Sequence, residues 1–352
     1  MSQNRWVLGA RPRTLPAAVV PVLVGTAVAW GTAVPSGDGG WLNHAPAGVL
    51  VRHASVPFPW IDWINFAMAL VVALALQIAT NYANDYSDGK RGTDDPSRRV
   101  GPPRLVGNGL ATPGEVKRAM AIAFGVALVA GGVLVVRVGW ELIPVGLAAV
   151  AAGYFYTGGP RPYGYLGLGE AFVFVFFGLV ATVGSTYVQL SPWTDAARRL
   201  GDVDSRLIDT TRFADLIDGQ RNELLWISLG CGVMVGCFAT ALLVVNNLRD
   251  IPGDTVSGKR TLAVKLGDQR TRVLYVALLA LPFLVLPFVA GLGGRPIGGL
   301  AFAAIMFSQA PTRTVLSGAK GPALIPVLGA TGKAQMVFGV LLTAGLIAST
   351  YI

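Results

Sequence analysis

The sequence predicts an all-α integral membrane protein with nine transmembrane helices in a single domain, residues 1–352. Of these residues, 53% are hydrophobic and only 13% are charged, whereas about a quarter of the residues in a soluble domain are charged. Mean hydropathy is +0.57. Apolar runs of about 20 residues, the length that crosses a hydrocarbon core of about 30 Å, recur along the chain. An ordinary soluble core is therefore excluded.

The apolar runs define nine predicted spans. The first run follows a basic segment, as in a secretory signal, but no clean cleavage site comes after it and eight further apolar segments do. We therefore interpret it as a retained first helix. The predicted spans are 15–34, 61–83, 116–136, 139–156, 166–190, 223–247, 271–290, 296–312 and 333–352.

The distribution of basic residues predicts the orientation of the spans. With the N-terminus inside, most of the 28 Lys and Arg residues fall in cytoplasmic segments, as the positive-inside rule requires. Since the number of spans is odd, the C-terminus is expected outside. The richness in Ala, Gly, Val and Arg is typical of a high-GC bacterium, so we expect a multi-pass protein of the bacterial inner (plasma) membrane. Topology thus accounts for the net charge of +9, and no nucleic-acid partner is expected.

Two connectors are longer than the others, and both are predicted on the outer face. Residues 35–60 are rich in Gly, Pro and Trp, and residues 191–222 mix charges of both signs. We interpret both as accessory loops. Residues 191–222 could alternatively form a short interfacial helix that caps the bundle.

The histidines and cysteines are poorly placed to hold a metal. His44 and His53 share one polar connector, and Cys231 and Cys237 lie six apart inside one apolar run, where we interpret them as packing residues. Any metal must therefore be held by carboxylates, which favours magnesium.

Two acidic clusters occur at the predicted cytoplasmic ends of the second and sixth spans. The first contains Asn84, Asp85, Asp88, Asp94 and Asp95, and is interrupted by the basic pair Lys90-Arg91. The second repeats the arrangement with Asn246, Asn247, Asp250 and Asp254, and ends in Lys259-Arg260. Carboxylates three or four apart lie on one face of a helix and can direct oxygens at a common point. Such a duplicate, on one membrane face, indicates a functional site.

Magnesium takes oxygen ligands in octahedral geometry and keeps several waters, so carboxylates from both clusters would complete its shell together with substrate phosphate oxygens. The adjacent basic pairs are suitably placed to neutralise the remaining charge of a diphosphate.

These clusters resemble the signature of the UbiA superfamily of membrane prenyltransferases, and within it the branch that prenylates 1,4-dihydroxy-2-naphthoate. The first matches the N-D-Y-S-D-x-x-x-G-x-D pattern from Asn84 to Asp94, and the second the N-N-x-R-D-x-x-x-D-x-x-x-G-K-R-T-L-A pattern from Asn246 to Ala263. Supporting matches begin at Arg11, Gly101 and Tyr154. The resemblance implies nine helices around a central cavity, with both motifs at its cytoplasmic mouth.

The resemblance also implies roles for individual residues. The expected metal ligands, for about two Mg²⁺ ions bridging the diphosphate, are Asn84, Asp88, Asp94, Asp250 and Asp254, with Asp95 as the alternative to Asp94. Asp85 either binds a metal or supports one of its ligands. The residues expected to take part in catalysis are Asp85, Asp88, Asp250, Asp254 and Tyr156. The residues expected to bind the substrates are Arg13, Lys90, Arg91, Arg104, Tyr156, Arg161, Asn246, Asn247, Lys259 and Arg260.

The implied reaction transfers a polyprenyl group from polyprenyl diphosphate to 1,4-dihydroxy-2-naphthoate, with loss of carbon dioxide and diphosphate, and gives demethylmenaquinone. Membrane lipid is the expected surrounding. One alternative is a related prenyltransferase acting on 4-hydroxybenzoate, homogentisate, a tetrapyrrole or a sugar phosphate. Another is an ion-coupled transporter, whose acidic residues should lie near the bilayer midplane and not at one face.

Overall fold

The computed structural model describes residues 4–30, 61–93, 101–190 and 210–352, and these residues form helices and no strands. The predicted all-α class is confirmed. The principal helices are α1 (Arg5–Ala10), α2 (Pro16–Ala29), α3 (Trp63–Arg91), α4 (Pro113–Arg137), α5 (Leu142–Phe155), α6 (Gly169–Val173), the π-helix η4 (Phe174–Val180), α8 (Thr210–Val256), α9 (Leu262–Leu292), the 3₁₀-helix η5 (Pro296–Ala304), α10 (Ile305–Leu316) and α11 (Ile325–Ala348).

Each of the nine predicted spans overlaps one of these helices or a helix pair. Within the described ranges, six helices are long and apolar enough to cross a membrane, and the bent pair Arg5–Thr14 and Pro16–Ala29 would add a seventh. Helix α5 has only 14 residues, and the eighth predicted span is divided between η5 and α10. An all-helical membrane bundle is therefore established.

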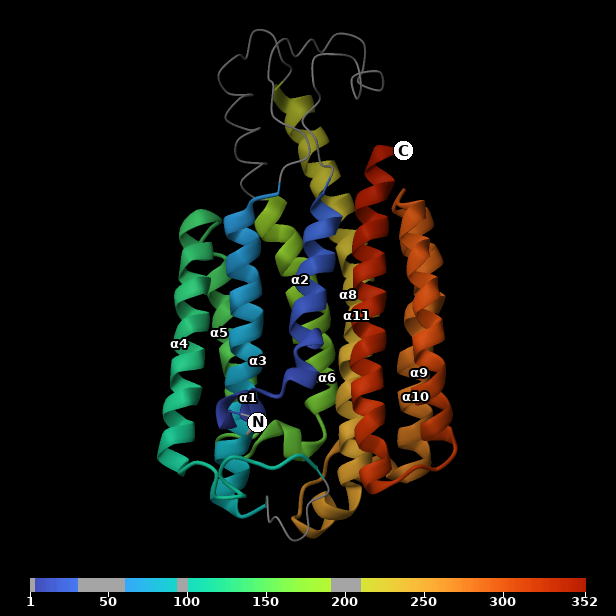
Figure 1. Cartoon of the computed structure of the whole chain (residues 1–352). Coiled ribbons are helices and arrows are strands. Elements are labelled where there is room, and N and C mark those ends of the chain that lie inside the picture. The colour runs from blue at the N-terminus through green and yellow to red at the C-terminus, as the bar shows by residue number, and fades with distance from the viewer. Residues whose placement is uncertain (1–3, 31–60, 94–100, 191–209) are drawn as a thin grey trace.

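Helix α8 begins earlier than predicted. Residues 210–222 belong to the predicted outer loop 191–222, yet they are helical and continue directly into the sixth span. At about 1.5 Å per residue, the 47-residue α8 exceeds the thickness of a bilayer, and its first turns project beyond the neighbouring helices (Figure 1). The helical structure of residues 210–222 departs from the loop expected there, because a polar helix continuous with a span lacks the apolar run that marks the span itself. The remaining residues of the two predicted outer loops, 35–60 and 191–209, lie outside the described part of the chain.

The bundle has two hydrophobic cores. The larger joins α2, α8, α9 and α11 and includes Phe238, Phe283 and Phe338, whose rings contact one another edge to face or tilted. The smaller joins α3 and α4 around Tyr82 and Phe124. In Figure 1, α3, α4 and α5 stand on one side and α8 to α11 on the other, with α2 and α6 between them. The helices thus leave room for a cavity between two separately packed groups.

Polar residues fix the helix ends. Thr112 and Glu115 form a capping box at the start of α4, where Pro113 supplies an N-terminal position that needs no donor. Asp62 caps α3 at one end, and Gly92 adopts the left-handed conformation (φ 69°) at the other. Helix α3 therefore ends shortly after Asp88 and presents Asn84, Asp85 and Asp88 from its last turns.

The end of the bundle opposite the acidic clusters is closed by a satisfied polar network. Arg137 donates to Asp62 Oδ2 at 2.6 Å and to Asn65 Oδ1 at 2.7 Å, and Asn65 donates to the Val188 carbonyl at 2.7 Å. Gln189 accepts from the Asp62 amide at 2.9 Å. These bonds join α3, α4 and the helix Gly169–Leu190, and every member has a partner, as buried polar groups require.

The chain bends sharply between α1 and α2. The two helical pieces meet at 52°, and Arg11 at the bend has a positive φ of 54°, which is uncommon for a residue other than glycine. The bend turns Arg11 towards α3. The N-terminal helix lies at the same end of the bundle as the acidic end of α3, and the C-terminus lies at the opposite end (Figure 1).

Candidate functional site

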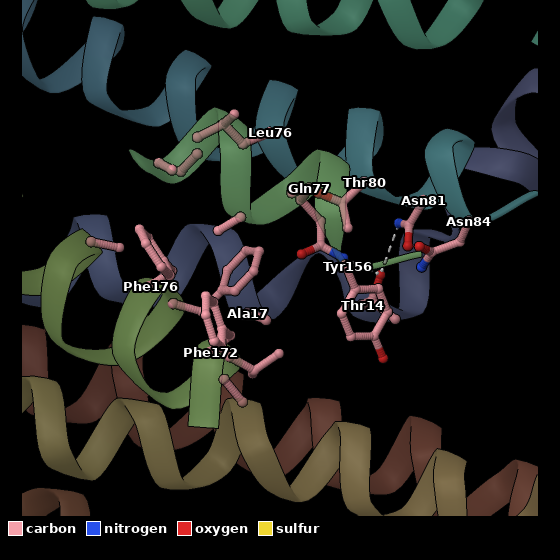
Figure 2. Close-up of a pocket in the computed structure, with 18 of the residues that line it drawn as sticks. Thr14, Ala17, Leu76, Gln77, Thr80, Asn81, Asn84, Tyr156, Phe172 and Phe176 are labelled. Carbon is pink, nitrogen blue, oxygen red and sulfur yellow. Dashed lines mark hydrogen bonds between the residues drawn. The ribbon is translucent and has the colours of Figure 1, made fainter. Parts of the chain in front are cut away.

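A cavity of about 890 Å³ lies between the two groups of helices. One part is apolar and is lined by side chains such as Val72, Leu76, Val135 and Val188, while the other is polar and holds both acidic motifs. Figure 2 shows Tyr156, Phe172 and Phe176 lining it beside α3. The residues of the predicted site that line it are Arg13, Asn84, Asp85, Asp88, Arg104, Tyr156, Asn246, Asn247, Asp250, Asp254 and Lys259.

Asp88 connects the two acidic motifs. Its Oδ2 is 3.0 Å from Lys259 Nζ, and its Oδ1 accepts a hydrogen bond from the Tyr165 hydroxyl. Lys259 also lies over the Tyr165 ring, 4.8 Å from its centre. Asp88 is only 4% exposed, so the carboxylate sits at the cavity wall with a cation from the opposite motif beside it.

Asp250 is paired within its own helix. Arg249 donates from Nε to Asp250 Oδ1 at 2.8 Å and from Nη2 to Oδ2 at 2.6 Å, a two-pronged contact that orients the carboxylate. The same Nη2 donates to Asn246 Oδ1 at 2.8 Å. Asp254 lies one turn further along and is half-buried; within the described part of the chain, its carboxylate accepts one long hydrogen bond, at 3.5 Å from the Thr261 hydroxyl. The Asp254 side chain is therefore held less tightly than those of Asn246 and Asp250.

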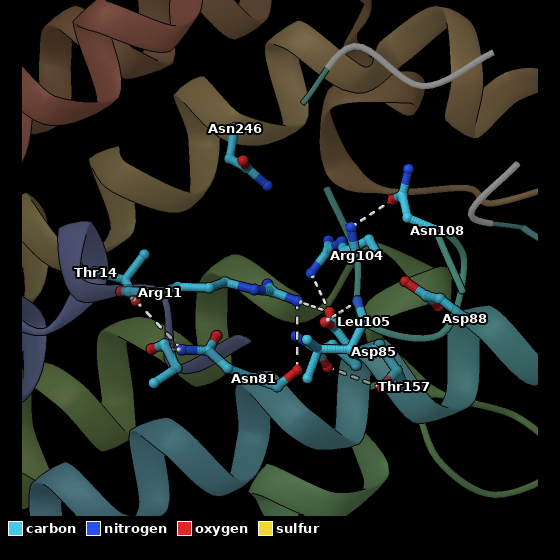
Figure 3. A network of polar contacts seen from close by, with 12 residues as sticks. Arg11, Thr14, Asn81, Asp85, Asp88, Arg104, Leu105, Asn108, Thr157 and Asn246 are labelled. Carbon is cyan, nitrogen blue, oxygen red and sulfur yellow. Dashed lines mark hydrogen bonds and ion pairs between the residues drawn. The ribbon is translucent and has the colours of Figure 1, made fainter. Parts of the chain in front are cut away.

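Asp85 is held differently from Asp88. Its Oδ1 accepts from both Arg11 and Arg104, and its Oδ2 accepts from the Leu105 amide at 3.1 Å. Figure 3 shows the two guanidinium groups converging on this carboxylate. Asp85 is 1% exposed. The buried triad fixes the N-terminal bend, α3 and the segment after the first motif together.

Three side chains of α3 that line the cavity are amides. Asn84 Oδ1 accepts from the Thr157 hydroxyl at 2.8 Å, and Asn81 donates to the Ala10 carbonyl at 2.9 Å. Gln77 donates to the Thr14 hydroxyl at 3.0 Å. Thr157 thus orients the Asn84 amide from the segment that follows α5.

Tyr156 lies at the polar end of an aromatic row. Its ring meets that of Tyr163 at 5.6 Å, Tyr163 stacks on Phe172 at 4.0 Å, and Phe172 stacks on Phe176 at 6.0 Å. Glycine at 169 permits this arrangement, because a Cβ there would lie 2.9 Å from a Tyr156 ring carbon. Burial raises the pKa of Tyr163, whose hydroxyl donates to the Ala152 carbonyl at 2.8 Å.

Four residues predicted to bind substrate do not line the cavity: Lys90, Arg91, Arg161 and Arg260. Lys90, Arg161 and Arg260 are exposed. Arg91 donates instead to the carbonyls of Thr157 and Gly159 at 2.5 Å each. Asp94 and its alternative Asp95 lie outside the described residues.

Several site residues were not assigned a role from the sequence. Arg11, Arg249 and Tyr165 all touch an acidic motif, and Glu170 holds Asn247. Arg11 and Arg249 were part of the matched motifs, so their positions already carried a signal. Tyr165 and Glu170 lie in a segment of aromatic residues and glycines that did not indicate their partners. Tyr165 bonds Asp88 and Glu170 bonds Asn247, each 77 residues away.

The donors present fit magnesium. Among the described residues, no three His, Cys, Asp or Glu side chains form one metal-holding group. The carboxylates Asp88, Asp250 and Asp254 instead line one cavity from two helices. Magnesium suits this arrangement because it is commonly held by one or two carboxylates, with waters and substrate phosphate oxygens completing its shell. All-oxygen donors from carboxylates and amides favour it over zinc or copper.

The chain matches the family described as "UbiA prenyltransferase family" over residues 18–320. It is 42% identical to the 1,4-dihydroxy-2-naphthoate octaprenyltransferase of Mycobacterium tuberculosis, over 97% of this chain and 96% of that protein. It is 33% identical to the enzyme of the same name from Escherichia coli, over 98% and 96%. The fold resembles a UbiA homologue from Archaeoglobus fulgidus bound to DMAPP and Mg²⁺, with a TM-score of 0.57 at 14% identity, covering 98% of this chain and 99% of that one.

Proposed function

Because the chain belongs to the UbiA prenyltransferase family, we propose that it transfers a polyprenyl group from polyprenyl diphosphate to 1,4-dihydroxy-2-naphthoate. Carbon dioxide and diphosphate leave, and demethylmenaquinone is formed. The observation that carries this assignment is the 42% identity, over nearly the full length of both chains, to a protein named for that acceptor. The cavity, with polar and apolar parts, suits a substrate with a charged head and a long apolar tail.

The reaction requires that an allylic C–O bond break in a cavity that excludes water. Negative charge then accumulates on the departing diphosphate, and groups already aimed at that charge lower the barrier. Asn84, Asp88, Asp250 and Asp254, with Asp94, would hold Mg²⁺, about two ions by analogy with other diphosphate sites. When bound, magnesium supplies the positive charge that neutralises the leaving group.

Lys259 is the protein's own cation at this position. Burial alone would lower its pKa, but Asp88, Tyr165 and Asp254 favour the charged form, and the net shift is upward. Since the pKa lies above an already high value, the ammonium stays protonated throughout the neutral range. It is therefore available to move from Asp88 to a diphosphate oxygen when substrate binds.

The apolar part of the cavity would hold the prenyl chain. On α3 the lining residues run from Asp88 to Ala69, which corresponds to about 28 Å along the helix. Tyr156 stands where the polar and apolar parts meet, and its ring can shield an allylic cation from water until the naphthoate ring attacks it. Attack at the carbon that bears the carboxylate forms the new C–C bond, and loss of carbon dioxide restores aromaticity.

The proposed topology has nine spans, with the polar mouth facing the cytoplasm. The positions of the termini at opposite ends, and of α1 beside the acidic motifs, support an odd number of crossings with the site on the N-terminal side (Figure 1). The protein would thus act in the bacterial plasma membrane and receive diphosphate substrates from the cytoplasm.

A transfer assay tests the proposal. Membranes containing the protein receive labelled polyprenyl diphosphate, Mg²⁺ and either dihydroxynaphthoate or 4-hydroxybenzoate, with Asp88→Asn as the matched inactive control. We expect product from the naphthoate that disappears with EDTA and in the control. Product from the benzoate alone would reassign the acceptor, and no transfer to either by folded protein would refute the proposed reaction.

A further inference from the structure

A buried carboxylate lies next to the cavity without lining it. Glu170, at the start of the helix Gly169–Leu190, is 6% exposed. It belongs to neither acidic motif. A buried carboxylate is costly unless it is bonded, and Glu170 Oε1 accepts a hydrogen bond from Asn247 Nδ2 at 2.9 Å.

This bond fixes the orientation of the Asn247 amide. Because Asn247 donates through Nδ2, its amide nitrogen faces Glu170 and its amide oxygen points elsewhere. Asn247 is 7% exposed and lines the cavity. No described residue donates a hydrogen bond to its Oδ1. The oxygen is therefore available to a donor that enters the cavity.

Asn247 does not share the face that carries the metal-binding candidates. Asn246, Asp250 and Asp254 recur every four residues along α8 and lie on one face. Asn247 is displaced from that face by one residue, which is about 100° around the helix axis. Its amide is thus directed to a different part of the cavity from the acidic residues.

The face of α8 that carries Asn247 lies near Tyr156. A Cβ built on Gly169, the residue before Glu170, would be 2.9 Å from the Tyr156 ring and 3.4 Å from Leu243. Leu243 precedes Asn247 by one helical turn, so the two lie on the same face of α8. Tyr156, Gly169 and this face of α8 are consequently neighbours, at the junction of the polar and apolar parts.

We propose that Asn247, positioned by Glu170, accepts a hydrogen bond from a hydroxyl group of the aromatic acceptor and thereby selects hydroxylated rings. The inference rests on the proposed function. Of the two substrates, only the dihydroxy ring offers hydroxyl donors, because an ionised diphosphate and a hydrocarbon chain offer none. A site built to bond a hydroxyl strongly rejects an analogue that lacks it, so the pair would act in specificity.

Binding of the acceptor alone tests this role. Quenching of naphthoate fluorescence by purified protein, without magnesium or polyprenyl diphosphate, gives the Kd of dihydroxynaphthoate. Asn247→Leu should raise that Kd about tenfold, the effect of losing one buried hydrogen bond, and leave the KM of polyprenyl diphosphate and the Mg²⁺ requirement unchanged. 2-Naphthoate, which has no hydroxyl group to donate, should bind the variant and the wild type equally well.

Variants of Glu170 separate recognition from packing. Glu170→Gln keeps an acceptor oxygen for the amide and should bind the naphthoate nearly as wild type, whereas Glu170→Leu should weaken binding. The double variant Glu170→Leu, Asn247→Leu removes both polar groups, so it should recover thermal stability without recovering naphthoate affinity. Recovery of both would show that the pair only packs.

The inference would be overturned if wild-type protein transferred to the naphthoate but Asn247→Leu left the naphthoate Kd unchanged. A variant that altered the Mg²⁺ requirement and not this Kd would overturn it equally. If wild-type protein neither bound nor prenylated the naphthoate, the proposed function would fail first and the inference with it.

Discussion

Lys259 Nζ lies 3.0 Å from Asp88 Oδ2, and this ion pair links the loop after α8 to the last turns of α3. Both side chains are largely buried, with 11% and 6% of their surfaces exposed. The two acidic motifs are thereby held across the cavity by a cation that has its own use in diphosphate binding. Substrate binding must replace this pair with new partners for both groups.

The pair predicts that Lys259 acts mainly on the diphosphate. Lys259→Met should raise the KM of polyprenyl diphosphate at least about tenfold, because charged hydrogen bonds contribute roughly 1.5–3 kcal/mol, and should leave the acceptor Kd unchanged. Lys259→Arg should recover part of the loss. Steady-state kinetics with each substrate varied in turn would check this, and a variant that changed only the acceptor constant would contradict it.

Asp85 is predicted to stabilise the fold more than it assists the chemistry. Asp85→Asn leaves Arg11 and Arg104 facing each other without the shared carboxylate, and breaking a buried ion pair costs about 3–5 kcal/mol. We expect a clear fall in the thermal midpoint in detergent, with binding of polyprenyl diphosphate retained by the fraction that stays folded.

Asp254→Asn is the matched control, since Asp254 is half-buried and, among the described residues, its carboxylate accepts one long hydrogen bond, from Thr261. Its thermal midpoint should be nearly unchanged, while prenyl transfer falls by about 100-fold or more for loss of a charged group at the leaving diphosphate. The account of both residues would be wrong if the two variants exchanged these properties.

Gly169→Ala should displace the Tyr156 ring, because the added Cβ would lie 2.9 Å from it. Transfer should fall several-fold with folding intact. Gly125→Ala in α4 adds the same atom where nothing lies within 4 Å and should behave as wild type. Equal activity in both variants would show that the position of the Tyr156 ring does not matter for prenyl transfer.

The sequence could predict the all-helical membrane class and the convergence of the two motifs. Long apolar runs mark membrane helices because a helix satisfies its backbone hydrogen bonds within the segment that crosses the lipid. Asp88, Asp250 and Asp254 share a cavity because each recurs at helical spacing from a helix end on the same side.

Long-range polar pairing could not be predicted. Arg91 lies close to the aspartates in sequence, yet it donates to the carbonyls of residues 157 and 159. Which way a basic side chain turns depends on the carbonyls and carboxylates that the fold brings near it. The bend at Arg11 has the same origin, since its left-handed backbone is stabilised by a partner 74 residues away.

The fate of the acceptor carboxylate tests the central claim most directly. Dihydroxynaphthoate labelled in its carboxyl carbon is supplied with polyprenyl diphosphate and Mg²⁺, and released carbon dioxide is measured beside prenylated product. Decarboxylating transfer to the naphthoate predicts one labelled carbon dioxide for each prenyl group transferred, and none in Asp88→Asn. A prenylated product that retained the label, or carbon dioxide release without prenylation, would contradict it.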